Sequence, residues 1–419
     1  MLASTIRTEI ITIGDELLLG QTIDTNSAWL GRRLAEIGFR VTNKTAVADS
    51  EEEILTSIHV AQSRCKLVII TGGLGPTKDD ITKHTLKKYF QCGDRLDESV
   101  LEHLEDIFAK RDRELLETNK IQAILPSACQ TLFNRAGTAP GMWFENEFGI
   151  VVSMPGVPNE VYTITDESLI PKLEQQYNLP RVLYKTVVTV MIAESLLSKR
   201  LESYEESLPD GINLAYLPAF NTVKLRLTRS NPELSEAEFI RCFDALLAEL
   251  GSDVFCLDDQ DPAKAISKYL ISANIGFSTA ESCTGGYIAH RLMQEAGISA
   301  IFPGSLVAYA NEIKVNELGV SSTDLAIHGA VSEAVALQMA KGICKKFNVP
   351  LGIATTGIAG PSGGSEEKPV GLVFIAVVFE DSMLVKKFRM PGNREQIIQR
   401  SANAAFALIK QVLQVEVLP

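Results

Sequence analysis

The 419-residue sequence contains few cysteines and histidines, and neither residue type is arranged as in a disulfide framework or a zinc site. The seven cysteines are odd in number and widely scattered, without a C-x-x-C pair. The five histidines are isolated, and no H-E-x-x-H motif occurs. A disulfide framework and a structural zinc site are therefore not expected. Any metal would be held by carboxylates and substrate oxygens, which are the ligands of hard cations such as Mg²⁺.

Positive charge and long apolar runs are also scarce. Lys and Arg total 40 against 52 for Asp and Glu, so the net charge is −12. An acidic chain repels phosphate backbones, and we expect no direct binding of nucleic acid. No apolar run approaches the ~20 residues of a membrane span, so no membrane association is expected. The first residues, MLASTIRTEIITIG, enter a strand pattern directly and lack the features of a signal peptide, which predicts a cytoplasmic protein.

Strand and helix patterns alternate over roughly the first 170 residues and again after residue 264, as in α/β folds. At ~150 residues per domain, the length corresponds to two or three domains. We predict an α/β domain over residues 1–175, a small α+β connector domain over 176–258, and a second α/β domain over 259–419. The acidic segment LDDQDPAK (257–264) is interpreted as a linker between the last two.

Several local signals place the expected elements of the first domain. Strands are expected at Thr8–Gly14, Phe39–Val47 and Leu67–Thr71. Asn26 or Ser27 is expected to cap a helix. An S-x-x-E capping box formed by Ser50 and Glu53 is expected to open the next one.

The segment AESCTGG (280–286) lies where a strand ends and a helix is expected to begin. At such a junction Ser282 would face unpaired backbone N–H groups and the positive end of the helix, which favour an alkoxide or an oxyanion. Alternatively, Ser282 or Thr284 is only a helix cap. Cys283 is a competing nucleophile, although no histidine occupies an obvious partner motif.

The segment YANEIK (309–314) supplies groups that could activate this serine. Tyr309 ends an expected strand, Asn311 is expected to cap a short helix, and Lys314 lies on that helix. A lysine kept neutral by desolvation, or a tyrosine polarised by it, can take a proton from serine without a histidine. The alternative places Tyr309 in the core and Lys314 on the solvated surface.

A glycine-rich loop, TTGIAGPSGGSEEKPVG (355–371), follows a third buried strand. It can offer backbone N–H groups to an anion or oxyanion, or it can be an ordinary flexible loop. It is neither a P-loop nor a G-x-G-x-x-G motif. Three such segments at adjacent strand ends predict a ligand site in the second α/β domain.

The first domain has its own cluster of glycines and acids. GDELLLG (14–20) places Asp15 and Glu16 after a strand, and GGLGPTKDD (72–80) places Asp79 and Asp80 after glycines at the next strand end. Glycines let the backbone approach a diphosphate, and carboxylates can hold Mg²⁺ against it. Otherwise these are turn glycines and acids that cap helices.

Together, AESCTGG, YANEIK, HGAVSE (328–333) and the glycine-rich loop resemble the C-terminal domain of the CinA family, which includes bacterial nicotinamide mononucleotide amidohydrolases. The resemblance implies hydrolysis of nicotinamide mononucleotide to nicotinate mononucleotide and ammonia, without a metal or other cofactor. It makes Ser282 the nucleophile, and Tyr309 and Lys314 the groups that activate it and relay protons. The substrate-binding residues that it implies are Thr284, Gly285, Gly286, Asn311, Gly357, Gly360, Gly363 and Gly364.

GDELLLG, TNSAWLGRRL, TGGLGPTKDD, NKIQAILP, GTAPG and MPGVPNE are similar to the N-terminal domain of CinA proteins. That domain resembles molybdopterin-binding folds, and in some members it is a metal-dependent ADP-ribose pyrophosphatase that forms AMP and ribose 5-phosphate. The resemblance implies a divalent cation, Mg²⁺ or Co²⁺, and a homo-oligomer, as a dimer. The implied contacts to substrate are Gly72, Gly73, Gly75 and Asn119, and those to metal are Asp15, Glu16, Asp79 and Asp80.

The sequence thus predicts a bifunctional enzyme of pyridine-nucleotide salvage that acts on small nucleotides. Two alternatives remain open at this point. In the first, the N-terminal domain is a non-catalytic module that binds a nucleotide or a pterin. In the second, the chain is an adaptor protein in competence or recombination. One departure from the family pattern is MIAES (191–195), where Met191 and Ala193 replace glycines that serve a positive φ or close packing.

Overall fold

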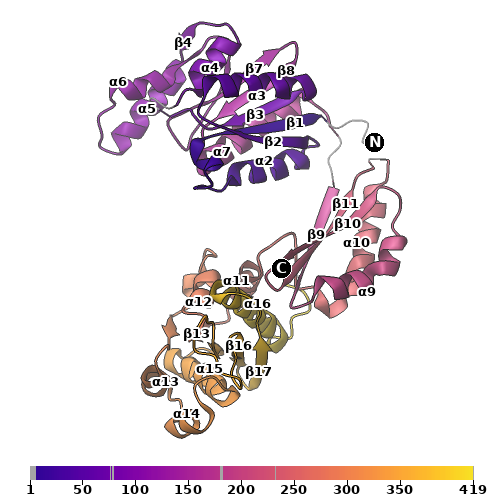
Figure 1. Cartoon of the computed structure of the whole chain (residues 1–419), viewed down its shortest axis with the longest axis vertical. Helices are drawn as coiled ribbons and strands as arrows, with labels where there is room; N and C mark the ends of the chain where they lie inside the picture. Colours follow the sequence, from indigo (N-terminus) through magenta and orange to yellow (C-terminus); the bar gives the residue numbers. More distant parts are fainter. Residues whose placement is uncertain (1–5, 76, 78–79, 180–182, 232, 419) are drawn as a thin grey trace. The chain divides into compact units, whose positions relative to one another are not determined.

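The structure, a computed structural model, describes residues 6–75, 77, 80–179, 183–231 and 233–418. The chain divides into two compact units, Met1–Leu183 and Tyr184–Pro419, and each is described by itself (Figure 1). Both units combine sheets with packed helices, so the predicted α/β class is confirmed. Over the described ranges, no helix is both long and apolar enough to cross a bilayer.

A six-stranded sheet forms the centre of the N-terminal unit. Its strands are β1 (Arg7–Ile13), β2 (Arg40–Val47), β3 (Leu67–Thr71), β6 (Gln130–Leu132), β7 (Gly141–Asn146) and β8 (Gly149–Met154). The order is β2-β1-β3-β8-β7-β6, with the first four strands parallel and the last two antiparallel to their neighbours. The three strands predicted here are confirmed. Every residue of β3 is buried, as expected for a central parallel strand covered on both faces.

Helices cover both faces of this sheet (Figure 1). On one face lie α2 (Thr25–Glu36), α7 (Pro158–Ile164), the π-helical turn η2 (Thr165–Leu169) and α8 (Ile170–Gln176). On the other lie α3 (Glu51–Arg64) and α4 (Thr82–Tyr89). The short α1 (Asp15–Leu18) follows β1. After α4 come β4 (Asp94–Leu96), α5 (Glu98–Lys110), α6 (Glu117–Lys120), η1 (Ile121–Ala123) and β5 (Ile124–Pro126).

Two helix starts differ from the prediction. Asp24 caps α2, because its carboxylate accepts a hydrogen bond from the N–H of Ser27; Asn26 already lies inside the helix. Ser50 does stand at the N-cap of α3, but its side chain makes no capping bond. Glu53 turns its carboxylate to a backbone N–H outside the helix. The predicted capping box is therefore wrong.

The region after residue 183 contains a four-stranded sheet of order β10-β11-β9-β12. Its elements are β9 (Leu183–Val190), α9 (Glu194–Glu206), β10 (Ile212–Ala219), β11 (Thr222–Arg229), α10 (Glu236–Leu250), η3 (Gly251–Asp253) and β12 (Cys256–Leu257). The segment interpreted as a linker is structured instead, since β12 pairs with β9 and Asp261 caps α11 (Pro262–Ser272). The boundaries predicted at residues 175 and 258 stay predictions.

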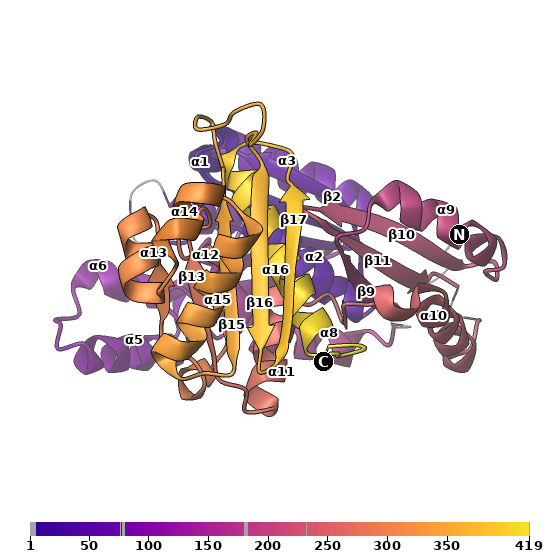
Figure 2. The same ribbon diagram turned by 90° about the horizontal axis from the view of Figure 1, so that it is seen from below.

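The remainder of the C-terminal unit is built on a five-stranded sheet of order β14-β13-β15-β16-β17 (Figure 2). Its strands are β13 (Phe277–Glu281), β14 (Ser305–Val307), β15 (Leu351–Gly357), β16 (Leu372–Phe379) and β17 (Ser382–Arg389). Strands β14, β13 and β15 are parallel, whereas β16 and β17 are antiparallel to their neighbours. The carboxyl ends of the three parallel strands therefore meet at one edge.

Two helical layers enclose this sheet. One layer contains α11, α12 (Tyr287–Leu292), η4 (Ile298–Ala300) and α16 (Arg394–Val412). The other contains α13 (Asn311–Leu318), α14 (Ser322–His328) and α15 (Glu333–Phe347). In Figure 2, α15 lies over β15 and β16 on the near side, and α16 lies behind the sheet.

Candidate active site

The ends of the three parallel strands border one cavity of about 260 Å³. Ser282 follows β13, Tyr309 lies just after β14, and Gly357 ends β15. The loops after parallel strands are where α/β sheets bind ligands. The predicted residues that line this cavity are Ser282, Tyr309, Asn311, Lys314, Gly357, Gly360 and Gly363.

Lys314 is buried beside the serine. Lys314 lies on the first turn of α13 and is 1% exposed. The alternative that placed it on the solvated surface is therefore wrong. The Nζ atom lies 3.3 Å from Oγ of Ser282 and donates hydrogen bonds to the carbonyl oxygens of Ala308 (2.7 Å) and Tyr309 (3.0 Å). Burial lowers the pKa of Lys314, because the ammonium form loses its hydration.

The two carbonyl contacts also orient the lysine. A neutral amine has two N–H groups and one lone pair. When Ala308 and Tyr309 accept from the two N–H groups, the lone pair is left for the hydroxyl of Ser282. The arrangement can therefore accept a proton from Ser282 Oγ, as a general base must.

Backbone contacts hold Ser282 in place. Its N–H donates to the carbonyl oxygen of Thr355 on β15 (3.0 Å), and its own carbonyl oxygen accepts from the N–H of Gly285 (3.2 Å). Thr284 Oγ1 lies 2.7 Å from Thr355 Oγ1. The N-cap of α12 is Gly286, so neither Ser282 nor Thr284 caps that helix, and this alternative is wrong.

Glu281 occupies the helix end that was expected to bind an anion. Its buried carboxylate accepts from the N–H groups of Gly286 (3.0 Å), Ile288 (3.1 Å) and Ala289 (2.8 Å). These N–H groups are therefore not unpaired, and that part of the prediction is wrong. This role of Glu281 was not predicted from the sequence, although the residue lies within AESCTGG. Its consequence is that the turn carrying Ser282 is tied to α12 through a charged acceptor.

The neighbouring thiol is a poor competitor for the serine. Cys283 is buried, and burial raises the pKa of its thiol to about 12. A thiol nucleophile reacts as the thiolate, which is scarce at neutral pH when the pKa is this high.

Tyr309 is 62% exposed, so the alternative that placed it in the core is wrong. Its hydroxyl lies 3.4 Å from a guanidinium nitrogen of Arg394. Within the described residues, the hydroxyl makes no hydrogen bond to Ser282 or Lys314. Tyr309 therefore lines the cavity at its solvent side in this structure, and its proton-relay role stays a prediction.

Arg394 was not found by sequence reasoning, yet it borders the cavity. It is the first residue of α16, and its Nη1 donates to the carbonyl oxygen of Gly360 (2.9 Å). A signal for this helix start was present, because Asn393 and Gln396 form a capping box. The guanidinium places a positive charge at the cavity, where it can bind an anionic substrate group.

The glycine-rich loop supplies backbone groups to the same cavity. The N–H groups of Ala359 and Gly360 donate to no acceptor among the residues that the structure describes, and both residues line the cavity. Such N–H groups can stabilise an oxyanion. Gly364, in contrast, does not line the cavity. It packs against the backbone of Val370 instead, because a Cβ at this glycine would lie 2.9 Å from the Val370 nitrogen.

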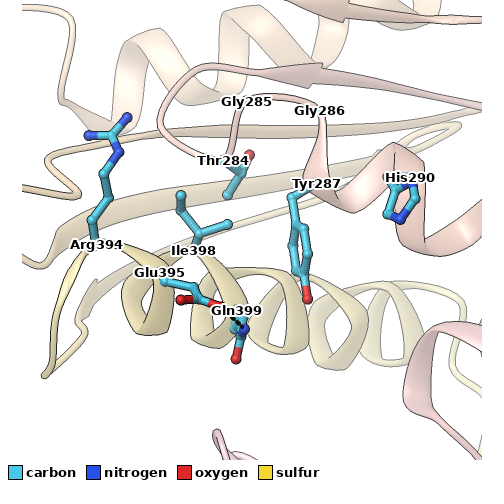
Figure 3. Close-up of a pocket in the computed structure, with 9 residues that line it drawn as sticks. All are labelled: Thr284, Gly285, Gly286, Tyr287, His290, Arg394, Glu395, Ile398 and Gln399. Carbon is cyan, nitrogen blue, oxygen red and sulfur yellow. Dashed lines mark hydrogen bonds between the residues drawn. The ribbon is translucent and has the colours of Figure 1, made fainter. Parts of the chain in front are cut away.

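Thr284, Gly285 and Gly286 line a different, larger cavity of about 540 Å³ (Figure 3). Arg394 borders both cavities. The structure thus places these three predicted substrate-binding residues next to the serine cavity rather than in it.

At the first sheet, two of the predicted glycines lie very close to other atoms of the chain. Gly72 has φ +110°, and a Cβ there would lie 2.3 Å from the carbonyl oxygen of Ile13. Gly73 has φ +64°, and a Cβ there would lie 2.2 Å from Thr82 Oγ1. These two positions require glycine for both conformation and space.

Two buried polar atoms beside these glycines have no hydrogen-bond partner among the described residues. They are Oδ1 of Asn26 and Oγ1 of Thr82. Asn26 donates through Nδ2 to the carbonyl oxygen of Gly156 (2.7 Å), which lies against Gly72. Buried polar atoms without a partner are costly, and a bound ligand can satisfy them. These two atoms are therefore candidate ligand contacts, and the binding site predicted at this edge stays a prediction.

Three of the four predicted metal ligands, Asp15, Glu16 and Asp80, lie within the described residues. Asp15 exchanges backbone-to-carboxylate hydrogen bonds with Asp49 (3.1 and 3.4 Å), and the Asp80 carboxylate accepts from the N–H of Thr77 (3.0 Å). The carboxylate of Glu16 lies against Gly14, because a Cβ at this glycine would lie 2.5 Å from Glu16 Oε1. Gly75 lies against the Asp80 carboxylate and Asn119 lies in α6. Asp79 is outside the described residues.

Across the described ranges, no three His, Cys, Asp or Glu side chains form a possible metal site. Asp15, Glu16 and Asp80 would therefore hold a divalent cation only together with Asp79 or with oxygen atoms of a substrate, and the metal site stays a prediction.

Comparison with known proteins gives matches over almost the whole chain. Residues 259–413 match the family model "CinA C-terminal domain", and residues 9–175 match "Probable molybdopterin binding domain". A CinA-like protein of Cytophaga hutchinsonii is 41% identical over 408 residues, covering 97% of this chain and 98% of that protein. One of Flavobacterium psychrophilum is 40% identical, covering 97% and 98%. The crystal structure of a competence/damage inducible protein from Agrobacterium tumefaciens is 39% identical over 36% of this chain and 94% of that chain, with a TM-score of 0.36.

Proposed function

The chain belongs to the CinA family, and from this premise we propose that its C-terminal domain hydrolyses the carboxamide of nicotinamide mononucleotide. The products are nicotinate mononucleotide and ammonia. The observation that carries the proposal is the buried Lys314 amine, 3.3 Å from the hydroxyl of Ser282. A serine with a desolvated lysine base is a known solution to amide hydrolysis.

The reaction follows from this pair. Ser282 Oγ attacks the carboxamide carbon while its proton passes to Lys314 Nζ. The C–N bond then breaks, and Lys314 returns the proton to the leaving ammonia, which leaves an acyl ester on Ser282. Water hydrolyses this ester in a second cycle with Lys314 again as the base. The N–H groups of Ala359 and Gly360 are the candidate donors to the oxyanion, and Arg394 is the candidate partner of the substrate phosphate.

We further propose that the N-terminal domain binds ADP-ribose at the glycine-rich edge and hydrolyses its diphosphate to AMP and ribose 5-phosphate with Mg²⁺ or Co²⁺. The buried Oδ1 of Asn26 and Oγ1 of Thr82, which have no hydrogen-bond partner among the described residues, support binding at this edge. The alternatives are a non-catalytic nucleotide- or pterin-binding module, and an adaptor in competence or recombination. We propose a cytoplasmic homodimer acting on small nucleotides, without nucleic-acid or membrane partners.

The test of the amidohydrolase is ammonia release from nicotinamide mononucleotide by the wild type and by Ser282→Ala. We expect release by the wild type and none by Ser282→Ala. A matched control is Ser278→Ala, because Ser278 lies on β13, the strand that Ser282 follows, and its buried hydroxyl has no hydrogen-bond partner among the described residues. Release by Ser282→Ala would exclude this serine as the nucleophile. No release by any folded form would reject the reaction and favour a binding or adaptor function.

A further inference from the structure

The proposed reaction leaves the larger cavity of the C-terminal domain without a role. This cavity, called the Tyr287 cavity here, lies between the Gly285–Tyr287 turn and the first turns of α16 (Figure 3). We propose that it binds the second nucleotide of a pyridine dinucleotide whose carboxamide ring enters the cavity of Ser282. The proposal rests on the proposed amidohydrolase and names a further class of ligand for the same site.

Arg394 connects the two cavities. Its side chain borders both, and its guanidinium contacts the Tyr309 hydroxyl and the Gly360 carbonyl on the side of the Ser282 cavity. A mononucleotide bound with its ring at Ser282 and its phosphate at Arg394 would end there. It would leave about 540 Å³ of adjoining cavity empty. A diphosphate at Arg394 would instead continue into the Tyr287 cavity.

The ring of Tyr287 provides a platform for an aromatic base. Tyr287 is half-buried, and the guanidinium of Arg291 lies 5.7 Å from its ring centre. Arg291 is itself held by the Asp261 carboxylate at 2.6 and 2.7 Å. These contacts restrict the tyrosine, so that stacking a base on it orders few additional groups.

The wall formed by α16 supplies polar groups in the order that a nucleotide needs. Arg394 and Ile398 lie four residues apart on one row of the helix, and Glu395 and Gln399 lie on the next. Arg394 suits a phosphate, whereas Glu395 repels one and can accept from ribose hydroxyls. Gln399 donates through Nε2 to Glu395 Oε1 (3.2 Å) and lies about one and a half helical turns from Arg394. Phosphate, ribose and base would therefore follow one another from Arg394 toward Tyr287 and Gln399.

The probe for this cavity is NAD⁺, used as an inhibitor of nicotinamide mononucleotide hydrolysis by the full chain. Formation of nicotinate mononucleotide is measured by chromatography, with a chelator present to suppress the proposed N-terminal reaction. We expect NAD⁺ to compete with the mononucleotide. Tyr287→Ala should raise its inhibition constant about tenfold, within the range known for loss of one base stack, and change kcat/KM for the mononucleotide less than about threefold. Tyr287→Phe should bind NAD⁺ like the wild type.

Met293→Ala is the matched control, because Met293 is an exposed residue just after α12 and does not line the cavity. Its inhibition constant for NAD⁺ should not change. The inference is overturned if NAD⁺ does not compete, or if it inhibits the wild type and Tyr287→Ala equally.

If the wild type does not hydrolyse the mononucleotide, the proposed function fails separately. Calorimetric binding of NAD⁺ to wild type and Tyr287→Ala then decides the cavity by itself. Binding that is weaker in Tyr287→Ala supports the nucleotide site, and equal or absent binding overturns it.

Discussion

The Nζ atom of Lys314 lies 3.3 Å from Oγ of Ser282, although the two residues are 32 positions apart and belong to different elements. The serine sits after β13 and the lysine sits on α13. The two carbonyl oxygens that hold Lys314 come from the segment between β14 and α13. The segment after β14 thus places the base, Lys314, beside Ser282, which follows the neighbouring strand β13.

Replacing Lys314 by methionine should remove most of the activity. Methionine retains much of the side-chain volume but has no basic atom, so we expect kcat to fall by a factor on the order of 10² or more. Lys410→Met is a matched control in the same unit. Lys410 is also buried, its pKa is also lowered by burial, and it also donates to two carbonyl oxygens. Equal losses in both variants would show that a buried lysine is needed only for folding.

The rate should depend on the protonation of Lys314. Burial places the pKa of Lys314 below its usual value of 10.5, and only the neutral amine can accept the serine proton. Below that lowered pKa the lysine is charged and inactive, so kcat/KM should rise with pH and level off above it. A pH profile of nicotinate mononucleotide formation measures this. Lys314→Arg, which remains charged, should be inactive across the profile, and a rate that falls as pH rises would contradict the assignment.

Cys283 should be dispensable for the chemistry. Because burial raises the pKa of its thiol to about 12, the thiolate is rare at neutral pH. Cys283→Ala should therefore retain kcat within about threefold and lose at most a little stability from the small cavity. Thiol-alkylating reagents near pH 7 should leave the wild type active. Loss of activity in Cys283→Ala, with an unchanged Tm, would transfer the nucleophile to this residue.

Glu281→Gln should weaken the turn that carries Ser282. The amide can accept fewer of the three backbone hydrogen bonds and presents N–H₂ where the protein offers donors. A loss of about 2 kcal/mol is expected, which lowers Tm by about 4–8 °C. Because the residue positions the serine, kcat should fall more than KM rises. The exposed Glu366→Gln should change neither. An unchanged kcat would limit Glu281 to a role in stability.

Much of the fold was predictable because the signal is local. Buried strands such as Leu67–Thr71 are continuous apolar runs, and they were placed within a residue or two. Helix caps were less accurate, since Asp24 and Asn26 are both good capping residues and only the backbone conformation decides between them. Met191 does adopt the positive φ (+67°) that the missing glycine suggested, whereas Ala193, at φ −74°, does not.

The motifs that form the site could be predicted from the sequence, but the burial or exposure of their side chains could not. The alternative readings of Tyr309 and Lys314 were each wrong, because exposure depends on tertiary contacts that a short segment does not encode. The buried amine of Lys314 donates to the carbonyl oxygens of Ala308 and Tyr309, which lie in the segment before α13. Arg394 was missed because it reaches the cavity from α16, far along the sequence.

A chelator should separate the two proposed reactions. Nucleophile and base in the C-terminal site are both side chains, and among the described residues lining the Ser282 cavity there is no carboxylate to hold a hard cation. Formation of nicotinate mononucleotide should therefore survive EDTA. Formation of AMP from ADP-ribose should stop and return with Mg²⁺ or Co²⁺, because Asp15, Glu16 and Asp80 would have to act with a cation.

Both products can be followed in one sample that contains both substrates. Asp80→Asn should reduce AMP formation alone, and Ser282→Ala should abolish nicotinate mononucleotide alone, so each variant is the control for the other. Equal loss of both products in EDTA would contradict two independent sites. AMP formation that persists in EDTA would contradict the metal requirement. ADP-ribose that binds in the presence of Mg²⁺ or Co²⁺ but is never cleaved would make the N-terminal domain a binding module, because unpaired buried polar atoms such as Asn26 Oδ1 can bind a ligand without supplying catalysis.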